Sequence, residues 1–93
     1  MLKIERTQQF KRDYRRESKG RHRLTLESAL VSVLHSLVNN KPLTDKNRDH
    51  VLTGEWKDFR DCHIKPDLIL IYRKLDHDVL QLVRLGSHSE LGL

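Results

Sequence analysis

The residues best suited to chemistry gather in two pieces of the chain, a stretch from Asp49 to Asp67 and a short piece from Arg84 to His88. The first piece holds His50 and His63, and the second ends in a further histidine. An imidazole has an unperturbed pKa of about 6.5, so it gives and takes protons near neutrality. Lys and Arg side chains are interleaved with these groups. Together they predict acid–base chemistry on a phosphodiester.

Residues 59–65 can be interpreted as a strand, in which successive side chains point to opposite faces. One face then carries an acid, an imidazole and an amine, namely Asp61, His63 and Lys65. The other face carries Cys62 and Ile64, which suit a core. The polar row is therefore expected to face outward, and Cys62 is expected to be an inert buried thiol.

Two other chemistries fit the residues less well. Histidines and aspartates are zinc ligands by type, but no histidine or cysteine pair has helical ligand spacing, and Lys and Arg interrupt the polar row. A nucleophilic triad is weaker still, because Ser87 and Ser89 flank His88 in sequence, where they cannot easily meet its ring. No Gly-rich phosphate loop exists. We therefore expect neither a metal nor another cofactor.

Composition limits the fold to a single domain spanning residues 1–93. Hydrophobic residues make up 37% and aromatic residues 5%, which permits one modest core. The net charge of +5 favours a polyanionic partner, nucleic acid or acidic protein. The single Cys62 excludes an internal disulfide, and the N-terminus is charged within three residues, unlike a secretory signal. No apolar run approaches the roughly 20 residues that cross a membrane, so a cytoplasmic protein is expected.

The first half of the chain predicts a short strand at residues 2–6 followed by two helices. Thr7 suits the N-cap of the first helix, whose buried stripe is Phe10 and Tyr14 and which stops near Gly20. The second helix is predicted from residue 21 or 25 to 39. It is expected to supply most of the core through six apolar residues, Leu24, Leu30, Val31, Leu34, Leu37 and Val38.

The second half predicts three strands, at residues 59–65, 68–75 and 79–86, with a hairpin turn at 75–78. Residues 68–72 are apolar at odd and even positions alike, which is typical of a central strand covered on both sides. If the extended geometry persists, Arg84, Gly86 and His88 share one face. The order of elements predicts an α+β fold: a short strand, two helices, then an antiparallel meander of three to four strands in one twisted sheet.

Several remaining residues have two interpretations each. Trp56 either anchors a small core beneath the loop around His50 or stacks on a base, and the core role is favoured. The basic run 11–19 is either a solvated helix face or a surface that contacts RNA phosphates. His22, His35 and His77 fit no pattern and are expected to be bystanders.

The segment that carries the chemistry resembles the YafQ branch of the RelE/ParE toxin superfamily. The resemblance rests on Asp49-His50, Leu52, Gly54, Trp56-Lys57, Phe59-Arg60-Asp61, His63-Ile64, Pro66-Asp67 and Leu70-Ile71-Tyr72. It extends over nearly the whole chain, including its length and the tail from Arg84 to His88. Members of this branch are small bacterial toxins encoded beside an antitoxin, and many cleave messenger RNA in the ribosome.

The resemblance implies a ribosome-dependent endoribonuclease that uses no metal. His50, His63, Asp67 and His88 would form its catalytic group. Either Asp67 or His50 would take the proton of a ribose 2′-OH, and His88 would protonate the leaving oxygen. Asp61 would orient His63 or tune its pKa. The cations Arg84, Lys65 and Arg60 would contact phosphate.

The implied partners are the ribosome, messenger RNA and a cognate antitoxin, a small acidic protein of ribbon-helix-helix type, with operator DNA possible for the toxin–antitoxin complex. No membrane is involved. Two alternatives share the fold: a non-enzymatic inhibitor like the gyrase-directed ParE toxins, favoured if the histidines are scattered, and a plain RNA-binding module. The chain departs from the family near its C-terminus, where Leu91 or Leu93 is expected to pack in place of an aromatic residue.

Overall fold

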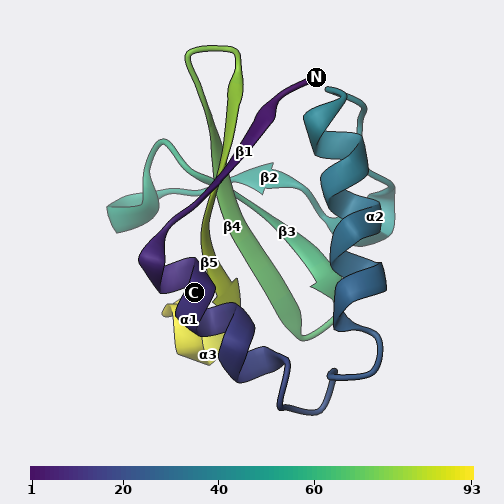
Figure 1. Cartoon of the computed structure of the whole chain (residues 1–93). Helices are drawn as coiled ribbons and strands as arrows, with labels where there is room; N and C mark the ends of the chain where they lie inside the picture. The colour runs from purple at the N-terminus through teal and green to yellow at the C-terminus, as the bar shows by residue number, and fades with distance from the viewer.

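The chain forms one five-stranded sheet with helices on both of its faces (Figure 1). The computed structural model describes residues 1–93. In chain order the elements are β1 (Lys3–Arg6), α1 (Gln8–Glu17), α2 (Leu26–Val38), the 3-10 helix η1 (Asp45–Asn47), β2 (His50–Val51), the 3-10 helix η2 (Gly54–Trp56), β3 (Arg60–Lys65), β4 (Leu68–Leu75), β5 (Val79–Gly86) and α3 (His88–Leu91).

The strands are ordered β1-β5-β4-β3-β2, with β1 parallel to β5 and every other pair antiparallel. The predicted α+β class, the first strand, the two helices and the meander β3-β4-β5 are confirmed. Four short elements were not predicted: the 3-10 helices η1 and η2, the strand β2 and the C-terminal helix α3. Both β2 and α3 lie beside the candidate chemistry, so the omissions affect the site more than the fold.

The helix α1 begins as its sequence predicts. The Thr7 side chain accepts a hydrogen bond from the Phe10 backbone N–H at 3.0 Å, which caps the helix. Phe10 is 2% exposed in the core. The opposite side of α1 carries exposed Lys and Arg residues, as the charge run indicated.

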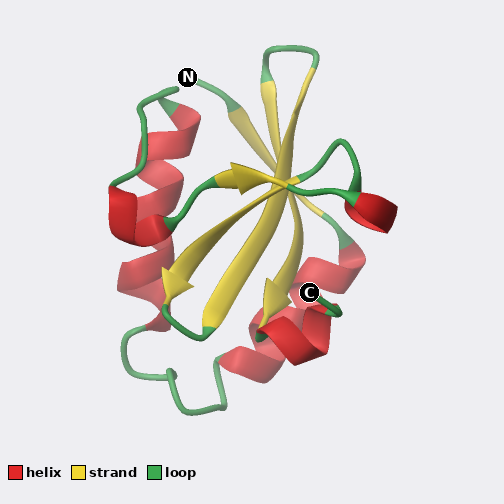
Figure 2. Ribbon diagram, turned by 180° about the vertical axis from the view of Figure 1, so that it is seen from behind, coloured by secondary structure: helices red, strands yellow, loops and turns green.

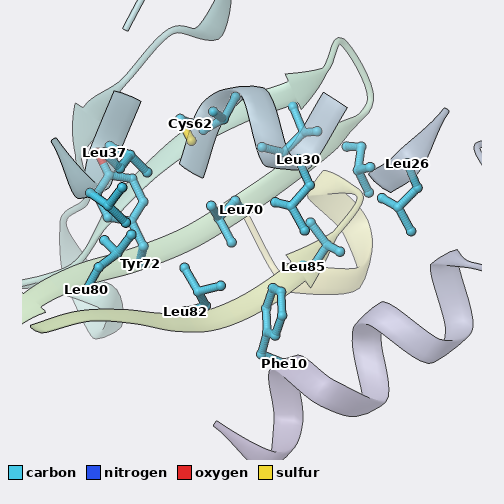
Figure 3. Close-up of a cluster of buried hydrophobic side chains, with 14 of the residues drawn as sticks. Phe10, Leu26, Leu30, Leu37, Cys62, Leu70, Tyr72, Leu80, Leu82 and Leu85 are labelled. Atoms are coloured by element: carbon cyan, nitrogen blue, oxygen red, sulfur yellow. The ribbon is translucent and has the colours of Figure 1, made fainter. Parts of the chain in front are cut away.

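The helix α2 covers one face of the sheet and supplies much of the main core (Figure 3). Its buried residues follow steps of three and four: Leu26, Leu30, Val33, Leu37 and Val38. The prediction is wrong for two of the expected core residues, which are exposed. Leu24 is 89% exposed because the helix begins only at Leu26, and Val31 is 55% exposed because it is turned away from that stripe.

The central strand β4 is covered on both sides, but unequally. Leu70 and Tyr72 belong to the main core under α2. Ile69 and Ile71 point to the other face, where they meet Leu91 of α3 in a smaller cluster. The sheet thus has a second small core, not the single one expected. This second face is covered only by short elements, seen from behind in Figure 2, and that leaves polar groups close to the surface.

The turn between β4 and β5 lies where the sequence places it. Asp76 and His77 have φ angles of 50° and 67°, and two successive left-handed residues are the geometry of the tight hairpin turn that matches strand twist. No helix is long and apolar enough to cross a membrane. Cys62 is a free thiol, fully buried beneath α2.

Candidate active site

Asp61 and His63 lie in the middle of β3 and point to the face of the sheet opposite α2. Their neighbour Cys62 belongs to the main core, so the predicted alternation holds. The predicted exposure is wrong, because Asp61 is 3% and His63 7% exposed. Lys65 does not continue their row, because the strand pairing shifts between His63 and Lys65.

His50 stands on β2 directly opposite Asp61 in the antiparallel pairing, so both side chains share one face. The His50 Nδ1 lies 2.7 Å from the Arg48 carbonyl oxygen. A carbonyl only accepts, so Nδ1 carries the proton and Nε2 keeps its lone pair. The side chain is 56% exposed, which leaves Nε2 accessible to a substrate.

The segment around His50 is held on both sides. Arg48 has a left-handed φ of 49°, which turns the chain from η1 into β2. Before this turn, the Asn47 side chain donates to the His63 backbone carbonyl at 2.8 Å. After it, Asp49 accepts hydrogen bonds from Arg60 and from the Tyr72 hydroxyl. The position of His50 is therefore fixed by its neighbours.

Asp61 is a buried acid at the centre of the histidines. Its Oδ1 lies 3.1 Å from His50 Nδ1, but that N–H points to the Arg48 carbonyl, so Oδ1 receives no hydrogen bond. Burial raises the pKa of Asp61 above its ordinary value, while the positive charge that His50, His63 and His88 can carry opposes the rise. The site therefore holds a buried carboxyl group beside the imidazoles.

His63 and His88 form the other half of the cluster. Their ring centroids are 5.4 Å apart and the ring planes are inclined by 58°. The His63 Nδ1 lies 3.2 Å from the Pro66 carbonyl, which again assigns the proton to Nδ1. His63 is thereby tied to the turn between β3 and β4.

His88 does not lie on an extended continuation of β5, contrary to the expectation that it shares a face with Arg84 and Gly86. The chain turns into α3 after Gly86, and His88 is the first residue of that helix. The Ser87 side chain accepts from the Glu90 N–H at 3.2 Å, and the Glu90 carboxylate accepts from the Ser87 N–H at 2.9 Å. This capping box fixes the start of α3.

Asp67 is held by two side chains from the loop between α1 and α2. His22 Nε2 lies 2.8 Å from one carboxylate oxygen and Arg21 lies 3.0 Å from the other. Burial alone would raise the pKa of Asp67, but the His22 hydrogen bond and the charges of His22 and Arg21 lower it below its ordinary value. The interpretation of His22 as a bystander is wrong. His35 lies on α2 and His77 in the hairpin turn, and both are exposed.

The three predicted phosphate contacts lie in different surroundings. Arg60 is paired with Asp49 at 3.2 Å on the α2 face of the sheet, away from His63. Lys65 lies past the strand irregularity, half-buried. Arg84 donates to Asp13 at 2.8 Å through Nε and leaves Nη1 without a partner in the chain. Of the three, only Arg84 both lies on the face of the sheet that carries the histidines and has an N–H donor without a partner in the chain.

The small core lies directly beneath this cluster. Trp56 packs on it and meets Phe59 edge to face at 5.5 Å, which confirms the favoured core role of Trp56. Leu91 is 4% exposed in the same core, as expected for the C-terminus, while Leu93 is 40% exposed. No group of three or more His, Cys, Asp or Glu side chains is spaced to hold a metal ion.

His50, His63 and His88 thus converge on Asp61 from β2, β3 and α3, although they are distant in sequence. Two residues that contact candidate site residues were missed: His22, which lies in a loop without periodicity, and Asp13, whose acidic side chain within a basic helix was the one available signal.

The chain matches the family model described as the bacterial toxin of the type II toxin–antitoxin system, YafQ, over residues 2–92. It is 36% identical to the mRNA interferase toxin YafQ of Escherichia coli K12, over 95% of this chain and 92% of the relative. Solved structures agree. The toxin in the E. coli DinJ-YafQ complex is 36% identical with a TM-score of 0.82 over 98% of both chains. A metal-bound toxin from Helicobacter pylori is 44% identical with a TM-score of 0.84, over 98% of this chain and 99% of that one. The chain therefore belongs to the YafQ family of bacterial toxins of type II toxin–antitoxin systems.

Proposed function

We propose that the protein is an endoribonuclease that cleaves messenger RNA during translation and that an antitoxin restrains it. The observation that carries the proposal is the convergence of three histidines on the buried Asp61. A ParE-like inhibitor of the same fold does not need such a cluster. The name of the E. coli relative, an mRNA interferase, supports the same activity.

The proposed reaction is an internal transfer at phosphorus. A base removes the proton of the ribose 2′-OH, and the 2′-oxygen attacks the adjacent phosphorus. The bond from phosphorus to the 5′-oxygen breaks, and an acid protonates that oxygen. The products are a 2′,3′-cyclic phosphate and a 5′-hydroxyl. No water enters this step and no electrons are exchanged, so side chains that move protons and stabilise charge are sufficient.

His50 is the better candidate for the base. Its Nδ1 proton is held by the Arg48 carbonyl, which leaves the exposed Nε2 lone pair for the 2′-OH. Asp67 is a weaker base because His22 and Arg21 lower its pKa. In this assignment Asp67 orients the turn that carries His63.

His88 is the proposed acid that protonates the leaving oxygen. It is exposed at the start of α3 and close to His63. His63 and the free Nη1 of Arg84 would stabilise the charge that develops on the phosphate oxygens. Asp61, whose charge lies near all three imidazoles, would balance the positive charge on the imidazole that takes up the proton. Lys65 and Arg60 would contact phosphates farther along the RNA, outside the reacting group.

The proposed partners follow from the charge and from the relatives. An antitoxin is bound to the toxin in the E. coli DinJ-YafQ complex. A net charge of +5 suits a small acidic antitoxin of ribbon-helix-helix type, and the same charge suits ribosomal RNA, messenger RNA and, for the toxin–antitoxin complex, operator DNA. A ribosome-dependent enzyme would work in the cytoplasm, where translation takes place.

The test is cleavage of a translated message by the purified protein on programmed ribosomes. The protein is supplied at one-tenth of the message concentration, and the 5′ and 3′ ends of the fragments are mapped. We expect several cleavages per molecule, with cyclic phosphate ends, and none on the same message without a start codon. Binding without turnover would favour a plain RNA-binding module. Inhibition of gyrase without cleavage would favour the ParE-like alternative.

A further inference from the structure

The outer edge of β5 is completed by side chains of α1 and not by another strand. The parallel partner β1 ends at the pair Arg6–Leu82. Beyond it, the Thr7 hydroxyl donates to the Val83 carbonyl at 2.9 Å. The Leu85 N–H then donates to Asp13 at 3.0 Å, and Arg16 donates to the Leu85 carbonyl at 2.8 Å. An open strand edge leaves such groups unpaired, so α1 replaces the missing strand.

Asp13 is the most deeply buried charge in the chain. It is 0% exposed and accepts hydrogen bonds from the Leu85 N–H, from Arg84 and Arg16, and from Gln9 at 3.2 Å. Burial would raise the pKa of Asp13, but these hydrogen bonds and the Arg84 charge lower it. A buried carboxylate with this many donors defines one geometry for the groups around it.

The same network continues into α3. Arg16 Nε lies 3.3 Å from the Glu90 carboxylate. That carboxylate also accepts the Ser87 N–H at 2.9 Å, so one side chain links α1 to the residue that precedes His88. Gly86 allows this approach, because a Cβ there would lie 2.9 Å from the Arg16 guanidinium and 3.2 Å from Glu90. Figure 2 shows α1 and α3 together at the end of β5.

We propose that Arg16 and Glu90 are positioning residues for His88. Asp13 fixes the position of Arg16 on α1, and the ion pair between Arg16 and Glu90 fixes the first turn of α3. The His88 ring is thereby held against His63. The inference rests on the proposed function, in which His88 is the acid. Glu90 is the more informative residue to substitute, because it contacts both Arg16 and the Ser87 N–H.

The test compares Glu90→Ala with Glu90→Gln and Arg16→Ala in single-turnover cleavage at saturating ribosomes. Losing a negative charge cannot weaken attraction to RNA, so a slower saturated rate of Glu90→Ala reports position and not binding. A displacement near 1 Å can cost about 100-fold in rate, so we expect a fall of about 10- to 100-fold. Glu90→Gln keeps an oxygen that accepts the Ser87 N–H and should recover most of the rate. Arg16→Ala should lower the saturated rate in the same direction.

Glu27→Ala is the matched control. Glu27 also lies in the first turn of a helix, and no side chain caps that helix. The control should cleave at the parent rate. A rate for Glu90→Ala equal to that of Glu27→Ala would overturn the proposal.

A second measurement does not depend on cleavage. In NMR spectra of the same variants, the contact between the His63 and His88 rings should weaken in Glu90→Ala and persist in Glu90→Gln. The contact between Leu91 and Ile71 should persist in both, which shows that α3 is still folded. A full ring contact in Glu90→Ala would refute the positioning role. If the parent itself does not cleave, the proposed function fails, and the ring contact still decides the positioning.

Discussion

The imidazoles of His63 and His88 lie with their centroids 5.4 Å apart, one on the middle of β3 and one on the first residue of α3. His63 is 7% exposed, whereas His88 lies at the surface. Two groups with the same chemistry therefore meet in different surroundings. Differences of this kind allow one imidazole to stabilise charge while the other exchanges protons with a substrate.

The first prediction concerns Asp61. Its pKa is raised in the folded protein, so the native state loses stability as the pH rises from the ordinary aspartate pKa through the raised one. The charge of Asp61 is buried and its Oδ1 accepts no hydrogen bond. Asp61→Asn should therefore stabilise the fold near neutrality by about 1 kcal/mol, while cleavage falls because the negative charge beside the histidines is lost.

Thermal melts of Asp61→Asn and the parent between pH 4 and 8 check this prediction. The difference in melting temperature should grow as the pH rises from the ordinary aspartate pKa through the raised one, and then stay constant. An Asn variant that melts lower than the parent at pH 8 would show that the Asp61 charge is well satisfied in the native state.

The second prediction concerns the pair of His22 and Asp67. The pKa of Asp67 is lowered, so its contribution to stability is present above the ordinary aspartate pKa and is lost as the pH falls through the lowered value. The side chain is 41% exposed, so screening by water and salt limits this contribution to about 0.5 kcal/mol. His22→Ala should remove it near neutrality.

His35→Ala, on the exposed side of α2, is the control for His22→Ala. Melts at pH 6 and pH 2.5 should show a small loss for His22→Ala at the higher pH only. A loss of the same size at both pH values would mean that His22 acts through packing and not through the charge of Asp67.

How much of the fold can be predicted from the sequence depends on whether each signal lies within a few neighbouring residues. The strands around Leu70 and Leu82 were predicted because alternation and apolar runs are properties of neighbouring residues. Leu24 was misassigned because a stripe of apolar residues does not show where a helix begins. The helix α3 was not predicted, although Ser87 and Glu90 have the spacing of a capping box and could have indicated it.

The site was harder to predict than the fold. The types and the alternation of Asp61 and His63 are local, and both were predicted. Their burial is not local, because it depends on β2, on the Trp56 segment and on α3, which return to β3 from distant parts of the chain. The contact of His22 with Asp67 also depends on how two loops meet, and no sequence period encodes that.

The third prediction concerns the antitoxin. The exposed face of α1 carries Arg12 and Arg15, Lys19 follows just after the helix, and no acidic side chain pairs with these three. We expect an acidic antitoxin segment to bind there or at the histidine rim, because complementary charge raises the association rate. Affinity and association rate, measured by surface plasmon resonance from low to high salt, should both fall as salt rises. An affinity that does not change with salt would argue against an electrostatic interface.

The fourth prediction is that cleavage is independent of zinc. The proposed base and acid act through protons alone, and Arg84 supplies the positive charge. Ribosomes held at fixed low magnesium should support the same cleavage rate with and without a zinc-selective chelator. Because a related toxin from H. pylori is metal-bound, added zinc should also be tested. Activity that is lost with the chelator and restored by zinc alone would contradict the prediction.

The most direct test of the proposed site is the single-turnover cleavage rate of His88→Ala on programmed ribosomes, with His77→Ala from the hairpin turn as the control. An acid at the leaving oxygen contributes about 10²- to 10⁴-fold, so His88→Ala should slow cleavage by that factor. Its melting temperature should stay close to that of the parent, because an exposed side chain usually changes stability by no more than about 0.5 kcal/mol. His77→Ala should cleave at the parent rate. A His88→Ala protein that cleaves within a few-fold of the parent, or that melts far below it, would contradict the assignment of His88 as the acid.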